Sequence, residues 1–179
     1  MYSLTNKVTT STCDSEGKLK LYSALQMMQD CSEMWIDSEP EVKDYFLQQS
    51  MGAFVDKVAG KLKRVDDATI QSMKLEPQLE MNYKDRRIIL PKTDGEVLEP
   101  IKVLRADIDY NKHLNNANYV RMAMELLPED FVVSGLRVEY RVAAKLGDSL
   151  TPTIYKTTDG IIVSLSIGSE VSAIIEFSK

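Results

Sequence analysis

The only histidine of the chain, His113, lies in a polar stretch that combines a carboxylate, several amides and an imidazole. In the run DYNKHLNNANYV, Asp109, Asn111 and His113 occupy alternate positions, so on an extended chain their side chains would point the same way. Asn115 and Asn116 follow at the place where a helix N-cap belongs. A carboxylate, an amide and an imidazole beside the positive end of a helix are groups that hydrolysis of an activated acyl bond requires. The stretch is therefore a candidate hydrolytic site.

A plainer interpretation of the same residues needs no catalysis. The asparagines could satisfy only the unpaired N–H groups at the start of a helix, and His113 could be a hydrogen-bonded core residue. The local pattern alone leaves both interpretations open.

Composition narrows the classes of function. The chain has 179 residues, of which 44% are hydrophobic and 27% charged, as expected for a soluble globule with one large domain or two small ones. Its net charge of -5 gives no basic footprint for nucleic acid, and no apolar run approaches the roughly 18 residues that span a bilayer. The start, MYSLTNKV, has no leader pattern. We expect a bacterial cytoplasmic protein that binds neither nucleic acid nor membrane.

The cysteine and histidine content argues against a soft-metal centre. Cys13 and Cys31 have neither metal-ligand spacing nor the density of a disulfide scaffold, and a single histidine cannot complete a cluster with them. We therefore expect two buried thiols, no metal and no cofactor.

Two segments share the order of strand, turn and amphipathic helix. In the first, residues 4–13 give a weak strand signal, and a helix ending at Pro40 has an apolar stripe of Leu21, Leu25, Met28, Ser32 and Trp35. In the second, Ile101–Asp107 is a predicted strand, and a helix ending at Pro128 has an apolar face of Tyr119, Met122, Ala123 and Leu126. We expect both faces to be core. The offset of 94 residues between GKLKLYSALQMM and NKHLNNANYVRM favours an internal duplication.

The C-terminal part has the pattern of an antiparallel meander. Alternation at 138–142 is followed by predicted strands at 151–157, 161–167 and 171–177, with the hairpin signal Asp159-Gly160 between two of them. One helix on the concave face of a curved antiparallel sheet would bury both apolar faces. The predicted fold class is α+β.

The same features suggest a division into domains. We predict an N-terminal unit over 1–76, a linker over 77–100 and a C-terminal unit over 101–179. The basic clusters KLKR at 61–64 and KDRR at 84–87 are either solvated surface or cations presented to an acidic partner.

Beyond these patterns, RADIDYNKHLNNANYVRMAMELLP closely resembles the signature of acyl-ACP thioesterases, a family of plant plastid enzymes and shorter bacterial ones built as tandem hotdog domains. TCDSEGKLKLYSALQMMQDCSEMW resembles the first hotdog helix of the bacterial members, and MGAFVDKVAGKLKRV the last strand of that hotdog. YRVAAKLGDSL resembles the strand after the second helix. The resemblance implies a double hotdog, each copy a long helix wrapped by a curved antiparallel sheet.

This resemblance implies hydrolysis of fatty acyl-ACP to free fatty acid in fatty acid biosynthesis, with acyl carrier protein as partner and without a cofactor. It carries Asp109, Asn111 and His113 over as active-site residues. Asn111 and His113 would activate water or polarise the thioester carbonyl, and Asp109 would orient them. We assign substrate binding to Asn115, Asn116 and Tyr119.

One departure from the family pattern concerns a carboxylate. Family members usually have Glu three residues after the tyrosine that Tyr140 matches, and some plant members follow it with Cys; here these positions are Ala143 and Ala144. Loss of a general base costs about 10²- to 10⁴-fold, unless Glu139 or Asp148 replaces it. The alternatives to an acyl-ACP thioesterase are a catalytically impaired acyl-binding hotdog protein and an acyl-CoA thioesterase.

A second departure concerns length. After Gln49 the sequence passes at Ser50 directly to what resembles the final strand of the first hotdog, although its middle strands would take roughly 30 to 60 residues. We predict that this join is not a natural peptide bond. Otherwise a partner chain, for example a second copy in a homodimer, should cover the apolar face of the first helix.

Overall fold

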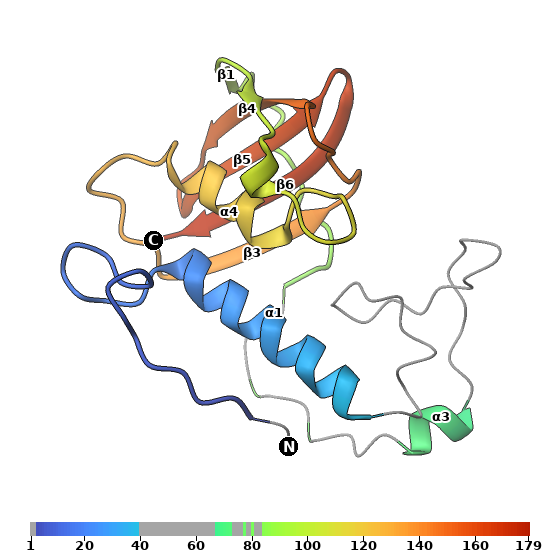
Figure 1. Cartoon of the computed structure of the whole chain (residues 1–179). Helices are drawn as coiled ribbons and strands as arrows, with labels where there is room; N and C mark the ends of the chain where they lie inside the picture. Colours follow the sequence, from blue (N-terminus) through green and yellow to red (C-terminus); the bar gives the residue numbers. More distant parts are fainter. Residues whose placement is uncertain (1–2, 40–66, 73–76, 78–79, 81–83) are drawn as a thin grey trace. The chain divides into compact units, whose positions relative to one another are not determined.

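The computed structural model describes residues 3–39, 67–72, 77, 80 and 84–179 (Figure 1). The chain divides into two compact units, Met1–Asn82 and Tyr83–Lys179. The predicted unnatural join at 49–50 and the KLKR cluster at 61–64 lie outside the described residues. No helix in the described ranges has the length and apolar character needed to cross a bilayer.

The first unit contains the helix α1 (Leu21–Ser38) that the sequence predicts, and a short helix α3 (Asp67–Ser72). The predicted core stripe of α1 is wrong at Met28, whose exposed fraction is 67%. Ser23 and Ile36 are instead the buried residues of this helix. Helical periodicity determines which side chains share a face, but it does not determine what covers that face.

The strand predicted at 4–13 does not form. Residues 3–9 have no regular structure and a turn follows, in which Thr9 N–H donates to Thr12 Oγ1 at 2.8 Å. Threonine hydroxyls that bond to nearby backbone compete with strand pairing, which explains why a Thr-rich run is a weak strand signal. Cys13 and Cys31 are free thiols, but each is partly exposed rather than buried.

The second unit is built on one antiparallel sheet. Its strands are β1 (Glu96–Val97), β2 (Ile101–Lys102), β3 (Gly135–Tyr140), β4 (Ser149–Lys156), β5 (Gly160–Ile167) and β6 (Glu170–Ser178). The order across the sheet is β1-β4-β5-β6-β3, and β2 pairs with β4. The predicted meander is thus confirmed as β4, β5 and β6, which are consecutive in the chain and adjacent in space (Figure 1).

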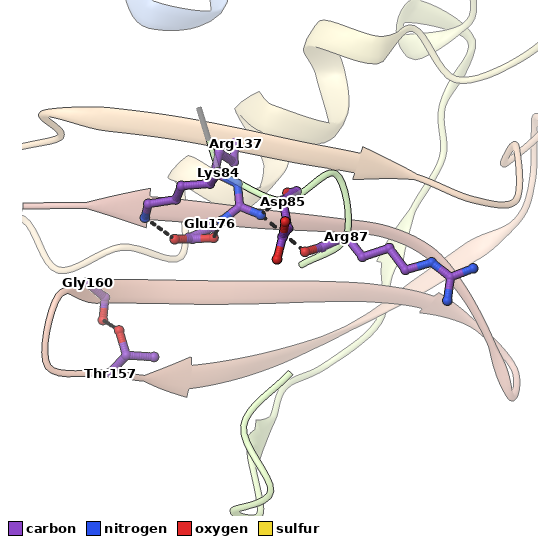
Figure 2. A network of polar contacts seen from close by, with 7 residues as sticks. All are labelled: Lys84, Asp85, Arg87, Arg137, Thr157, Gly160 and Glu176. Atoms are coloured by element: carbon purple, nitrogen blue, oxygen red, sulfur yellow. Dashed lines mark hydrogen bonds and ion pairs between the residues drawn. The ribbon is translucent and has the colours of Figure 1, made fainter. Parts of the chain in front are cut away.

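Glycines determine the turns of the meander. Between β4 and β5, Thr157 donates through its N–H and its hydroxyl to the carbonyl of Gly160, at 2.9 and 3.1 Å (Figure 2). A Cβ on Gly160 would collide with the carbonyl oxygen of Phe177 in β6, so only glycine fits this close approach. Between β5 and β6, Gly168 has a φ of 57°, which glycine adopts at little cost.

The second predicted helix, α4 (Asn116–Met124), lies over one face of the sheet. The Tyr119 ring meets the Tyr140 ring of β3 edge to face, with centroids 5.6 Å apart. Because side chains alternate along a strand, the face of Tyr140 also carries the fully buried core side chains Val163, Leu165, Ile175 and Phe177. The predicted core face of α4 is confirmed for Tyr119, Met122 and Ala123.

The opposite face of the sheet is covered by residues 84–90. Ile88 packs with Ile162 and Ile174 in a second buried cluster. Lys84 Nζ lies 2.9 Å from Glu176 Oε1, and Glu176 Oε2 lies 2.8 Å from Arg137 Nη1 (Figure 2).

The backbone of the KDRR cluster is held by the same arginine. Arg137 Nη2 donates to the carbonyl of Asp85 at 2.8 Å and to that of Arg87 at 3.2 Å (Figure 2). Part of the KDRR cluster therefore anchors the chain to the sheet. The predicted linker 77–100 likewise includes this covering segment and strand β1.

The predicted strand Ile101–Asp107 is much shorter in the structure. Strand β2 ends at Lys102, and Arg105–Asp107 forms a 3₁₀ helix, η1. Asp107 Oδ2 accepts the N–H of Leu104 at 2.8 Å. Aspartate favours such local turns over strand pairing because its carboxylate reaches nearby backbone N–H groups.

Candidate active site

The three predicted active-site residues lie in one tight loop, the Asp109–His113 loop. Asp109 Oδ1 accepts the N–H of Asn111 at 2.9 Å and that of His113 at 3.2 Å. Asp109 N–H in turn donates to the His113 carbonyl at 2.8 Å. The extended alternation that the sequence suggested is wrong, because Lys112 has a left-handed backbone with a φ of 63° and turns the chain. The Asp109 carboxylate organises the loop backbone.

The base of this loop is a short two-stranded bridge. Ile108 pairs with Leu114, and the Leu114 N–H donates to the carbonyl of Ala144 at 2.8 Å. Residue 144 therefore lies beside the loop, next to the position at 143 where the family pattern has Glu. Ala143 is exposed and Ala144 is fully buried.

The loop leads directly into the N-terminus of α4. Asn115 is the N-cap, as predicted, and its Oδ1 accepts the N–H of Ala117 at 2.9 Å. The carbonyl of Asn116 accepts the hydroxyl of Tyr140 at 2.9 Å. Within the described part of the chain, no hydrogen bond engages the N–H of Asn116. One polarised N–H at the positive helix end is thus available to a ligand.

Tyr119 joins α4 to the segment beside the loop. Its exposed fraction is 2%, and its hydroxyl accepts the N–H of Ala144 at 2.8 Å. Ser172 Oγ lies 3.1 Å from this hydroxyl and donates to the carbonyl of Val142 at 2.6 Å, which leaves Tyr119 as donor to Ser172. Tyr119 is therefore a core anchor, and its predicted contact with substrate stays a prediction.

The hydroxyl of Tyr140 is a donor to α4. Its burial and, to a lesser degree, the neighbouring Tyr119 raise the pKa of Tyr140 above its usual value. The protonated hydroxyl holds the first peptide of α4 in place.

Neither nearby carboxylate is placed to replace the missing Glu. Glu139 Oε2 accepts the N–H of Ile88 at 2.8 Å, and Glu139 Oε1 accepts Arg141 Nε at 2.9 Å. The bond from Ile88 and then that from Arg141 lower the pKa of Glu139, so it is a weak base. Alternation with Tyr140 also directs it to the face opposite α4. Asp148 Oδ2 is bonded to the N–H of Lys145 at 2.7 Å within a turn.

Four exposed cations lie in the loop or on segments that adjoin it. The basic surface consists of Lys102, Arg105, Lys112 and Lys145, all exposed. None of them forms an ion pair with another described residue. Their backbone segments are joined by the pairing of Lys102 with Ser149 and by the hydrogen bond between Leu114 and Ala144. As for metals, no group of three or more His, Cys, Asp or Glu in the described ranges could hold an ion.

Sequence reasoning missed a polar ring beneath the loop. Arg121 Nη2 donates to Asp107 Oδ1 at 2.7 Å, and Arg121 Nε donates to Asn118 Oδ1 at 3.2 Å. Asn118 Nδ2 closes the ring by donating to the Asp107 carbonyl at 3.2 Å. The spacing of three between Asn118 and Arg121 on a helix was a usable signal. Nothing in the sequence indicated that Asp107 would meet them.

The family model of the acyl-ACP thioesterase C-terminal domain matches residues 91–178, which include the whole loop and α4. The chain belongs to the acyl-ACP thioesterase family. A comparison with curated protein sequences gives no match.

Solved structures share the fold of this acyl-ACP thioesterase family member. An acyl-ACP thioesterase from Bacteroides thetaiotaomicron VPI-5482 aligns with a TM-score of 0.70 and 14% identity, over 94% of this chain and 93% of that one. The 12:0-ACP thioesterase from Umbellularia californica aligns with a TM-score of 0.57 and 16% identity, over 69% of this chain and 52% of that one. The α+β hotdog fold is thereby confirmed.

Proposed function

We propose that this chain hydrolyses the thioester of fatty acyl-ACP and releases free fatty acid in the cytoplasm. The observation that carries the proposal is the Asp109–His113 loop, which places the only histidine of the chain directly before the capped N-terminus of α4. Membership of the acyl-ACP thioesterase family supports the choice of substrate.

The chemistry assigns each group a role. His113, with Asn111, takes a proton from the attacking water or polarises the carbonyl, and water adds to the carbonyl carbon. The oxygen that becomes negative accepts the N–H of Asn116 at the positive end of α4. The carbon–sulfur bond then breaks, and the leaving thiolate recovers a proton. Because thiols have a pKa of about 8.5, the thiolate leaves without a strong acid.

The basic surface supports an anionic carrier. The chain carries a net charge of -5, yet four exposed cations that pair with no carboxylate among the described residues lie on the segments around the loop. Such a local field attracts an acidic partner and increases its rate of association. An acidic carrier protein fits this basic surface. We therefore assign carrier binding to this surface and not to the KDRR cluster, because Lys84 of that cluster is paired with Glu176.

A second candidate is acyl binding without hydrolysis. Ala143 leaves the loop without the Glu of the family pattern, and Glu139 and Asp148 are both engaged elsewhere. A site with the same loop but without the carboxylate would bind an acyl chain and cleave its thioester slowly.

Release of free thiol from purified acyl-ACP tests both candidates. We expect the parent to release thiol, His113→Ala to be at least about tenfold slower at an unchanged melting temperature, and Ala143→Glu to be faster. Acyl-CoA in place of acyl-ACP, compared by kcat/KM, identifies the carrier. Binding of acyl-ACP without thiol release by either the parent or Ala143→Glu would favour the second candidate.

A further inference from the structure

The ring of Asp107, Asn118 and Arg121 is more than a surface ion pair. The Asp107 side chain is only 8% exposed and that of Arg121 35%, and their contact is 2.7 Å long. The guanidinium and the carboxylate are both charged, and hydrogen bonds between charged groups are short and strong. The guanidinium uses two different nitrogens for its two partners, a fork that the single ammonium of lysine does not reproduce.

The ring joins the two ends of the Asp109–His113 loop. Asp107 precedes the loop, and its carbonyl accepts both Asn118 Nδ2 at 3.2 Å and the N–H of the N-cap Asn115 at 2.9 Å. Asp107 Oδ2 also holds the N–H of Leu104, so η1 is fixed at the same time. The entry to the loop is therefore bound to the first turn of α4, to which the exit of the loop leads.

We propose that Asp107, Asn118 and Arg121 form a clamp that positions His113 against the N-terminus of α4. None of the three contacts the reacting atoms in this proposal; they act through the loop and are positioning residues. The proposal rests on the proposed function for its effect on rate, but the position of His113 can be measured independently of any activity.

A small displacement of His113 is enough to change the rate. A reacting group misplaced by about 1 Å can lose about 10²-fold in rate. The loop is short and is crossed by the hydrogen bonds of Asp109 with Asn111 and His113, so we expect it to transmit a shift at its base to its tip. Opening the ring should therefore lower kcat more than it raises KM, because it removes no side chain of the basic surface.

The single histidine provides a direct readout. In untagged, ¹³C-labelled protein, the Cε1–H cross-peak of the imidazole belongs to His113 without ambiguity, because the chain contains one histidine. The variants are Arg121→Met, which keeps the apolar stem, Arg121→Lys, which keeps the charge, and Asn118→Ala. The matched control is Arg141→Met, since the Arg141 side chain is 40% exposed and forms a 2.9 Å ion pair with Glu139 outside the ring.

We expect Arg121→Met and Asn118→Ala to move the His113 cross-peak and to lower kcat about tenfold or more, with KM within about twofold of the parent. Arg121→Lys should partly restore the cross-peak position and kcat, and Arg141→Met should change neither the cross-peak nor kcat. If Arg121→Met does not fold, Asn118→Ala decides, because alanine is the better helix former at that position.

Two results would overturn the clamp: cross-peaks of folded Arg121→Met and Asn118→Ala that superimpose on that of the parent, or moved cross-peaks with an unchanged kcat in an active parent. A different result separates the two proposals. If the ring variants move the cross-peak while the parent itself releases no thiol from acyl-ACP, the clamp stands and the proposed function fails.

Discussion

The helices α1 and α4 are both amphipathic, but they differ in how many of their residues are buried. Helix α1 is 18 residues long and buries Ser23 and Ile36, whereas α4 is 9 residues long and buries five of its residues. The shorter helix buries more of its residues, and it lies on the sheet of the second unit. Length and periodicity therefore predict a helix, but its contribution to stability depends on the surface against which it packs.

The N-termini of the two helices differ in whether a side chain caps them. Asn115 caps α4 with its side chain, while Lys20 precedes α1 without a side-chain cap. The helix that adjoins the candidate site is thus fixed at its first turn by a cap, by the ring at Asp107 and by the hydroxyl of Tyr140. Precise placement of the helix end is what oxyanion stabilisation requires.

The largest expected effect tests whether the sheet under α4 carries the stability. Phe177→Ala should lower the free energy of unfolding by about 3–5 kcal/mol, because the ring is fully buried. Met28→Ala on α1 should change it by less than about 0.5 kcal/mol, since Met28 is 67% exposed. Urea unfolding followed by circular dichroism measures both. Equal losses would mean that α1 is as well packed as α4.

A smaller effect is expected from removing one hydroxyl. Tyr119→Phe leaves the buried N–H of Ala144 without its acceptor and should cost about 1–3 kcal/mol. Tyr22→Phe on α1 is the matched control, because its hydroxyl bonds to no other described residue, and it should be close to neutral. Thermal unfolding of the two variants compares them. A neutral Tyr119→Phe would show that another group satisfies Ala144.

Removing the residue at the N-cap position should change stability by a smaller amount. Asn115→Ala should destabilise the protein by about 1 kcal/mol because the N–H of Ala117 loses its partner. Lys20→Ala at the equivalent position of α1 should cost less than about 0.5 kcal/mol. Parallel urea titrations show whether the two caps differ; similar losses would argue that α1 depends on its first turn as α4 does.

The smallest effect concerns the sheet face opposite α4 and depends on pH. The pKa of Glu139 in the folded protein is lowered from 4.5, so its charge contributes stability that is present above pH 4.5 and is lost as the pH falls through the lower folded value. Glu139→Gln removes this contribution and can still accept the N–H of Ile88. The stability gap between parent and variant, from urea midpoints at about pH 7 and about pH 3, should narrow toward acid. A stability difference that widens toward acid would mean that folding raises the pKa of Glu139 instead of lowering it.

The elements that the sequence predicts correctly depend on residues that are near one another in the chain. Turn glycines and alternation were sufficient for the meander because hairpin partners are neighbours in the chain. Asn115 and the face of α4 followed from helical geometry. The conformation of the Asp109–His113 loop was not predictable, because a lysine in the left-handed region is uncommon and only the assembled hydrogen bonds of Asp109 hold it there.

Long-range partners were the other limit. The contacts of Asp107 with Arg121, of Glu139 with Ile88 and of Arg137 with residues 85 and 87 join segments that no local pattern relates. The predicted duplication and the active-site roles of Asn111 and His113 stay predictions.

The strand order has a consequence for the sequence of folding events. Pairing β4 with β5 and β5 with β6 closes loops of a few residues, whereas β3 can pair with β6 only across the whole β4–β5 hairpin. Short loops cost less entropy to close, so we expect the meander to form first and β3, with Tyr140 and the first turn of α4, to join later. Mild denaturant should then open the site while the meander persists. Native-state hydrogen exchange would reveal this as weaker protection of β3 than of β5, and equal protection would contradict it.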